Sequence, residues 1–391
     1  MTSLCTWIVV HDLGRSGAPI ALARMLRWHR ATARAGGFDR TIEGGLGSIH
    51  VIAHRGGPLA GAVASEVASL TVLEPDQGRS PALTAAVAAA QLGIPAPGEA
   101  FLTHHRRRAV RSLPRPDVVV VHGAGAWPVW ASLERATARP WLALHLHELS
   151  IGVRRSVPTA LLGELASRPD AIAMVCQPDA ALHDLLGPRA RAVSIVPGCT
   201  DEEDGPPRSP SGPTSASRRG AGAPTVVAVG EAGWRKGTDR FIALARQLTA
   251  PTPAPELLWI GAEPGPGWAW SVDADLPVRW TGALDDPWAV VPEGSVLAIP
   301  SREDPLPLVA LEAGIRGLPV VAAATGGLPS LLAEGRGWVA PCHDVRALEV
   351  VVREALGPAG AERAERLRAH VAECFRPDAV GPRWVAALRP A

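Results

Sequence analysis

The chain has 391 residues, 47% of them hydrophobic, which is enough for two domains with separate cores. Its formal net charge of +1 gives no argument for nucleic acid or an anionic membrane as a partner. The five cysteines form no C-x-x-C pair, so we expect reduced thiols in a cytoplasmic protein. The first apolar run, Trp7 to Val10, is followed at once by His11, and no run reaches the ~18 residues of a transmembrane helix, so we expect neither a signal peptide nor membrane association.

Short β-rich runs alternate with amphipathic helical stretches, which predicts parallel sheets covered by helices on both faces. In the first half, a helix over 19–35 follows the first expected strand, with Pro19 suited to its first turn. The strands expected in this half are Thr6–Val10, Ser48–Ala53, Ser69–Leu73, Asp117–Val121, Trp141–Leu146, Ala171–Cys176 and Val193–Val196.

The alternation is interrupted at 201–223, where Pro, Gly, Ser and charged residues show no periodicity, and we interpret this segment as a linker or mobile loop. The alternation then restarts, and the tail from Ala359 is helical with a break near Arg376-Pro377. The strands expected in the second half are Thr225–Val229, Glu256–Ile260, Val278–Trp280, Ser295–Ile299, Pro319–Ala322 and Gly337–Val339. The helices expected there are Asp239–Leu248, Leu308–Ile315, Leu328–Ala333 and Arg346–Leu356.

A glycine-punctuated loop, Gly230 to Gly237, follows one of these strands and precedes a helix. A loop in this place aims backbone N–H groups and cationic side chains at an anion. Lys236, beside Arg235, is the single lysine among 39 basic residues. Because arginine replaces lysine poorly where a compact ammonium must fit among phosphate oxygens, the sequence predicts a phosphate-binding loop.

A second cluster runs from the end of the strand at 295–299 into the helix that begins at Leu308. Asp304 lies in the entry loop and Glu312 lies inside the helix, eight positions later. The helix N-terminus between them offers free N–H groups to a diphosphate, and carboxylates accept hydrogen bonds from vicinal sugar hydroxyls. The alternative is an N-cap acid with a solvated glutamate, and Glu303 is the rival of Asp304. Apolar neighbours favour a partly buried Glu312 that needs a partner.

Histidines and glycines mark two strand ends in the first half. His145 and His147 share a face, and His147 stands where open α/β sheets place ligands, although a single histidine is more often structural. The loop from His11 to Pro19, which contains Gly17, follows the first strand and enters a helix, but glycine-rich turns before helices are common.

For two further features, the sequence predicts either no function or several possible ones. The D-x-D at 273–275 stands without supporting context, so we expect no metal site there. The basic run at 104–115 fits a solvated helix face, a site for an acidic acceptor or a membrane-surface patch. It lacks interleaved aromatic residues, which argues against RNA.

These segments resemble the signature of the family 4 glycosyltransferases, which have the GT-B fold. In that family a carboxylate, seven residues and a glutamate form an E-x7-E element, which Asp304 and Glu312 match with Asp in first place. The resemblance implies that Glu312 holds the nucleotide's ribose hydroxyls, Asp304 the donor sugar's hydroxyls and Lys236 the diphosphate. Leu308 joins this donor-binding set. Glu231 stands where the family has an arginine, a role that Arg235 can take.

The resemblance also implies an α/β fold of two Rossmann-like domains whose parallel sheets face each other across a cleft. The expected parts are an acceptor domain at 1–200, a nucleotide-sugar domain at 224–375 and a C-terminal helix at 376–391 that packs on the first domain. In the first domain, the loop with Gly17 approaches the donor phosphate and acceptor, and His147 contacts the donor sugar.

The function implied is a retaining, metal-independent transfer from a UDP-, GDP- or dTDP-linked sugar to a hydroxyl or amine of a small molecule or glycan. No cofactor is expected beyond this co-substrate, and a monomer or homodimer suffices. The chain has no tyrosine and one lysine among 39 basic residues, which indicates GC-rich codons. Such codon usage fits natural-product biosynthesis. The alternatives are a GT-B-type sugar-nucleotide epimerase and a non-catalytic partner subunit with the same fold, which Glu231 favours.

Overall fold

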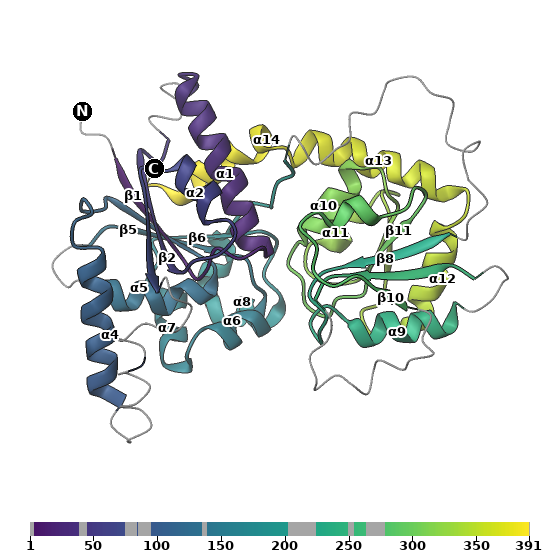
Figure 1. The fold of residues 1–391 in the computed structure, drawn as a ribbon, viewed down its shortest axis with the longest axis horizontal. Helices are drawn as coiled ribbons and strands as arrows, with labels where there is room; N and C mark the ends of the chain where they lie inside the picture. Colours follow the sequence, from purple (N-terminus) through teal and green to yellow (C-terminus); the bar gives the residue numbers. More distant parts are fainter. Residues whose placement is uncertain are drawn as a thin grey trace. The chain divides into compact units, whose positions relative to one another are not determined.

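The computed structural model describes residues 4–38, 45–74, 84, 95–134, 139–201, 224–248, 254–262 and 278–390. The chain divides into two compact units, residues 1–199 with 377–391 and residues 200–376, and each contains one sheet (Figure 1). The expected linker lies outside the described residues except for Asp201, and the D-x-D at 273–275 lies entirely outside them.

The first unit contains a parallel sheet with the strand order β3-β2-β1-β4-β5-β6-β7. Its strands are β1 (Cys5–Val10), β2 (Ser48–Arg55), β3 (Ser69–Glu74), β4 (Val118–His122), β5 (Trp141–Leu146), β6 (Ala171–Met174) and β7 (Ser194–Ile195). Its helices are α1 (Gly17–Arg34), α2 (Ala60–Glu66), α4 (Pro95–Ala109), α5 (Trp127–Leu133), α6 (Ser150–Ser156), α7 (Thr159–Ser167), α8 (Ala180–Leu186) and α14 (Pro377–Leu388).

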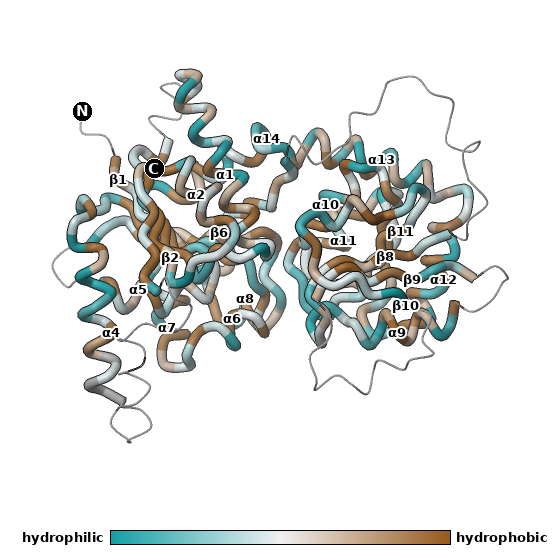
Figure 2. The backbone as a smooth tube through the Cα atoms, in the orientation of Figure 1, coloured by the Kyte–Doolittle hydropathy of each residue, from teal (hydrophilic) through white to brown (hydrophobic). Residues whose placement is uncertain are grey.

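Both faces of this sheet are buried, which is why its central strands are hydrophobic along most of their length (Figure 2). One face packs against α1 and α14, and the other against α5, α6 and α7. Val118, Val120 and Ala143 point to the first face. Because side chains alternate along a strand, every second residue of β4 and β5 points to the side of α1.

The second unit contains a parallel sheet with the order β10-β9-β8-β11-β12-β13. Its strands are β8 (Thr225–Val229), β9 (Glu256–Ile260), β10 (Val278–Trp280), β11 (Val296–Ile299), β12 (Val320–Ala323) and β13 (Trp338–Ala340). Its helices are α9 (Thr238–Gln247), α10 (Leu308–Ile315), α11 (Leu328–Leu332), α12 (Val345–Ala355) and α13 (Ala359–Cys374), with a 3-10 turn, η7, at Pro287–Val290.

The two sheets share one topology. In each, the first strand of the unit lies between the second and the fourth, so the strand order reverses beside it, at β1/β4 and at β8/β11. This is the doubly wound order of Rossmann-like domains, which confirms the predicted fold class. The strands end within two residues of the positions expected from the sequence. Among the described residues, no helix combines the length and apolarity needed to cross a bilayer.

The C-terminal helix α14 belongs to the first unit, although α13 just before it belongs to the second. Gly381 of α14 lies against the ring of Trp28 of α1, and the Trp28 indole Nε1 donates a hydrogen bond of 2.9 Å to Asp378 Oδ1. A Cβ added at Gly381 would lie 2.4 Å from three Trp28 ring atoms. The absence of a side chain at Gly381 therefore permits this close helix packing.

We predict that Gly381→Ala lowers the free energy of unfolding by about 1–3 kcal/mol, because the methyl group overpacks this contact. The matched control is Gly163→Ala in α7, where an added Cβ meets nothing within 4 Å. That change should be neutral or stabilising by up to about 1 kcal/mol. Urea denaturation followed by circular dichroism measures both, and equal stabilities of the two variants would contradict the packing argument.

Candidate functional site

The clearest cluster of charged side chains lies where the strand order of the second sheet reverses. Lys236 lies in the loop after β8 and Asp304 in the loop after β11, and these neighbouring strands are parallel. Lys236 Nζ lies 2.6 Å from Asp304 Oδ2, and their side chains are only 17% and 6% exposed. Open α/β sheets bind ligands at this position, outside the carboxyl ends of the strands.

Glycines allow the Lys236 loop to pack tightly. Gly230 has a φ of 142°, and a Cβ there would lie 3.2 Å from Lys236 Cε. Gly237 has a φ of 72°, and a Cβ there would lie 2.1 Å from the carbonyl oxygen of Pro300, at the end of β11. Only glycine fits both requirements. The loop is thus held against the neighbouring strand with Lys236 directed at Asp304.

Arg235 and Arg302 have different environments around this ion pair. Arg235 is 47% exposed, its Nη1 lies 3.9 Å from Asp304 Oδ1, and it donates to the carbonyl of Glu303 at 3.3 Å. Arg302 instead pairs with Asp239, since it donates to both carboxylate oxygens of that residue at 2.6 and 2.5 Å. Arg235 is therefore the second cation beside Lys236. Of the two candidate acids, Asp304 and not Glu303 pairs with the lysine.

Glu312 lies inside α10, is 8% exposed and has an aromatic partner. The Trp288 indole Nε1, in η7, donates to Glu312 Oε2 at 3.0 Å. The Arg316 guanidinium lies 4.8 Å from the centroid of the Trp288 ring. Leu308 is the first residue of the same helix and is also buried. The carboxylate of Glu312 is thus oriented by a donor that comes from a different segment of the chain.

In the first unit, three histidines gather at the carboxyl ends of β4 and β5. His122 pairs in register with His145 across the two strands, and His147 follows two residues later on the same face. Ring centroids lie 4.3 Å apart for His145–His147 and for His122–His147, and 5.1 Å apart for His122–His145. The predicted shared face of His145 and His147 is confirmed.

Burial keeps these imidazoles neutral near pH 7. It lowers the pKa of His122 to about 4, against a weaker opposing effect of the hydrogen bond to the Ala18 carbonyl. Burial also lowers the pKa values of His145 and His147 well below the usual 6.5, and repulsion from His122 adds to this. The cluster therefore supplies lone pairs and N–H groups and no positive charge.

Gly17 is the first residue of α1, is exposed, and directly follows the loop after β1. The turn before it is closed by the Gly14 N–H, which donates to Asp12 Oδ1 at 2.8 Å. This loop and the end of β4 flank the reversal of strand order in the first sheet. The candidate residues thus fall into two sets: Gly17 and His147 in the first unit, and Arg235, Lys236, Asp304, Leu308 and Glu312 in the second.

Sequence reasoning missed His122 and Trp288. His122 ends the run of four valines in β4, and the signal for it was a polar residue at the carboxyl end of a buried strand. Trp288 lies 24 residues from Glu312, and no local pattern links the two residues.

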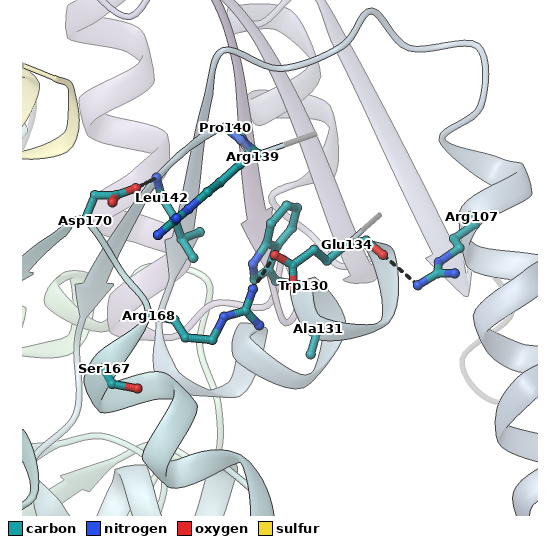
Figure 3. A pocket seen from close by; sticks show the side chains of 10 residues that line it. All are labelled: Arg107, Trp130, Ala131, Glu134, Arg139, Pro140, Leu142, Ser167, Arg168 and Asp170. Atoms are coloured by element: carbon teal, nitrogen blue, oxygen red, sulfur yellow. Dashed lines mark hydrogen bonds and ion pairs between the residues drawn. The ribbon is translucent and has the colours of Figure 1, made fainter. Parts of the chain in front are cut away.

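A cavity of about 680 Å³ in the first unit lies at the start of β5, away from His147 at that strand's end (Figure 3). Four of its five charged lining residues bind one another or the backbone. Arg168 pairs with Glu134, Arg107 donates to the carbonyls of Ser132 and Glu134, and Asp170 accepts from the N–H of Leu142. We assign it no function. Of the basic run at 104–115, Arg107 therefore has a structural role.

The second unit matches a known family. Residues 223–357, which contain the loop from Gly230 to Gly237 and α10, match the model described as "Glycosyl transferases group 1". The D-inositol 3-phosphate glycosyltransferase of Streptomyces avermitilis is 46% identical over 83 residues, which are 21% of this chain and 18% of that protein. The glycogen synthase of Mycobacterium tuberculosis is 29% identical over 196 residues, 47% of this chain and 45% of that one. The matches thus span less than half of these relatives.

Solved structures match the whole chain. Anabaena Alr3699/HepE, solved in complex with UDP-glucose, has a TM-score of 0.69 at 17% identity, with 98% of both chains covered. The sucrose-phosphate synthase of Thermosynechococcus elongatus has a TM-score of 0.69 at 17% identity, over 97% of this chain and 96% of that one. These neighbours share the fold of two Rossmann-like domains. Together, the family model matches the second unit, and the solved structures support the GT-B fold of two Rossmann-like domains.

Proposed function

We propose that this chain is a retaining family 4 glycosyltransferase that moves a sugar from a nucleoside-diphosphate donor to a hydroxyl or amine of a small molecule or glycan. The observation that carries the proposal is the Lys236–Asp304 pair, 2.6 Å apart where the strand order of the second sheet reverses. The transfer uses no metal ion and no further cofactor. The natural-product setting inferred from residue usage remains part of this proposal.

The electrostatics of the second unit support the choice of a diphosphate leaving group. As the sugar–phosphate bond breaks, negative charge grows on the diphosphate, and preorganised cations and N–H groups stabilise it. Lys236 and the half-exposed Arg235 supply positive charge. Helix α10 begins at Leu308 behind Pro307, with no side-chain cap from the described residues, so its first-turn N–H groups are suited to the same anion.

The carboxylates suit the sugar parts of the donor. Asp304 is held beside Lys236 by the ion pair and by the Ser301 hydroxyl, which donates to Oδ2 at 3.2 Å. From there it can accept hydrogen bonds from the donor sugar's hydroxyls. Glu312, oriented by Trp288, can accept from the two ribose hydroxyls.

The first unit contributes His147 as a contact of the donor sugar, and the loop with Gly17 as an approach to phosphate and acceptor. We assign no protein nucleophile. Retention follows from attack on the same face, with the departing phosphate oxygen taking the acceptor's proton. The five cysteines, all among the described residues, form no disulfide with one another, which fits the proposed cytoplasmic location. UDP is the first nucleotide to test, because Alr3699/HepE was solved with UDP-glucose.

We predict that at least one of UDP, GDP, ADP and dTDP raises the melting temperature of the protein, with UDP the first candidate. Lys236→Ala should remove this shift and lower transfer by about 100-fold or more, because a cation aimed at the leaving group is lost. The control is Arg353→Ala, which removes an ion pair with Glu349 in α12. It should leave both readouts unchanged. No shift with any nucleotide, or near-normal turnover of Lys236→Ala, would refute the assignment.

We also predict that Trp288→Phe raises the KM for the donor by roughly tenfold with little change in kcat, because it keeps the ring but removes a hydrogen bond to a carboxylate. Trp338 provides a close match, since its Nε1 donates to Glu354 Oε2 at 2.9 Å and Arg363 lies 4.3 Å from its ring centroid. Trp338→Phe should lower stability without changing the donor KM. Steady-state kinetics decide, and equal donor KM values for the two variants would exclude a role of Trp288 in positioning Glu312.

A further inference from the structure

The three-histidine cluster has more ligating atoms than its surroundings use. His122 Nδ1, both ring nitrogens of His145 and His147 Nε2 are buried without a hydrogen-bond partner among the described residues. The backbone of Val196 lies near His145, but the contact does not have hydrogen-bond geometry. Buried polar atoms are normally paired, and an unpaired one loses its hydration without compensation. Unpartnered nitrogens converging on one place therefore point to a ligand.

A hydrogen bond fixes the orientation of the His122 ring and decides which of its nitrogens carries the proton. Its Nε2 lies 3.0 Å from the carbonyl oxygen of Ala18 in the first turn of α1, and a carbonyl only accepts, so Nε2 carries the proton. Nδ1 then presents its lone pair inside the cluster. Metal-bound histidines typically donate their second ring nitrogen to a carbonyl or carboxylate in this manner.

We propose that His122, His145 and His147 form a binding site for one divalent late first-row transition-metal ion, with Zn²⁺ as the best match. Imidazole nitrogens suit zinc, cobalt, nickel and copper, and three histidines with an open fourth position form a known type of zinc site. Within the described ranges, no other group of three or more His, Cys, Asp and Glu side chains has its ligand atoms this close together.

The distances fit after small ring rotations. One ligand atom from each histidine lies within 4.8 Å of the other two. In a tetrahedral zinc site with Zn–N bonds of 2.0–2.1 Å, neighbouring nitrogens lie about 3.4 Å apart. Each ring must therefore turn toward a common point. His145 loses no hydrogen bond in doing so, since neither of its ring nitrogens has one. His147 is the least buried of the three residues.

The carboxylate of Glu148, the residue that follows His147 in the chain, is bound to the backbone. Glu148 Oε2 accepts from the N–H groups of Ala124 at 3.0 Å and His147 at 2.9 Å. These bonds orient the end of β5. The imidazoles are then the side chains placed to bind a metal ion. The ion is not a reactant of the proposed sugar transfer, and its binding is measured without donor or acceptor, so this proposal and the proposed function can fail separately.

The test is metal binding by the full chain after removal of bound ions with a chelator. Calorimetry with Zn²⁺ should show one ion per chain with a Kd on the order of micromolar or tighter. Co²⁺ at the same site should give the intense visible absorption of a tetrahedral ion. His145→Gln and His147→Asn should each weaken binding by more than roughly 100-fold, since loss of even an outer partner typically costs about 10–100-fold.

Two controls address other ligands. His183→Gln changes an exposed histidine on α8 and should leave affinity unchanged. Cys374→Ser removes a thiol that lies 3.7 Å from His370 Nδ1, the ring nitrogen of another possible ligand, and should also have no effect. If a histidine variant fails to fold, the Co²⁺ spectrum of the unaltered chain decides. Weak octahedral bands, thiolate-to-cobalt charge transfer, or no binding would each overturn the proposal, as would retained affinity in folded His145→Gln and His147→Asn.

Discussion

The ion pair between Lys236 and Asp304 is the interaction on which the second unit's site depends. It joins the loops after β8 and β11 while both side chains are largely shielded from water. A partly buried charge is stable only when it is paired, and removing one partner leaves the other uncompensated. Gly230 leaves room for the Lys236 side chain, and Gly237 leaves room for the carbonyl oxygen of Pro300. The same geometry that holds the loop also concentrates charge where a diphosphate can bind.

The strands and the residues of this site could be predicted because their signals are local. A single lysine in a glycine-punctuated loop, and two carboxylates eight positions apart, stand in stretches that are continuous in sequence. The choice of Asp304 over Glu303 needed the structure, since both are buried and only the distance to Lys236 separates them. His122 and Trp288 could not be found locally. Their partners lie 23 and 24 residues away, and strand order and loop path decide the contacts.

In the C-terminal segment, too, the local sequence predicts where a helix breaks, whereas contacts distant in sequence decide where the helix packs. The break between α13 and α14 follows from Pro377, which lacks the N–H needed to continue a helix. Which sheet α14 covers is not encoded in that proline. It is decided by the fit of Gly381 against Trp28 and by the bond from Trp28 to Asp378, across some 350 residues of chain. The first unit therefore includes a helix that the order of the sequence alone would assign to the second.

The two sheets share a topology but offer different chemistry where their strand order reverses. The second presents the cationic side chains of Lys236 and Arg235. The first presents three imidazoles whose pKa values burial lowers, to about 4 for His122. Neutral imidazoles cannot neutralise a diphosphate, but they can exchange hydrogen bonds with hydroxyl groups or bind a metal ion through their lone pairs. Under the proposed function, the second unit therefore supplies the positive charge that faces the donor's diphosphate. The histidine cluster therefore acts through unprotonated nitrogens.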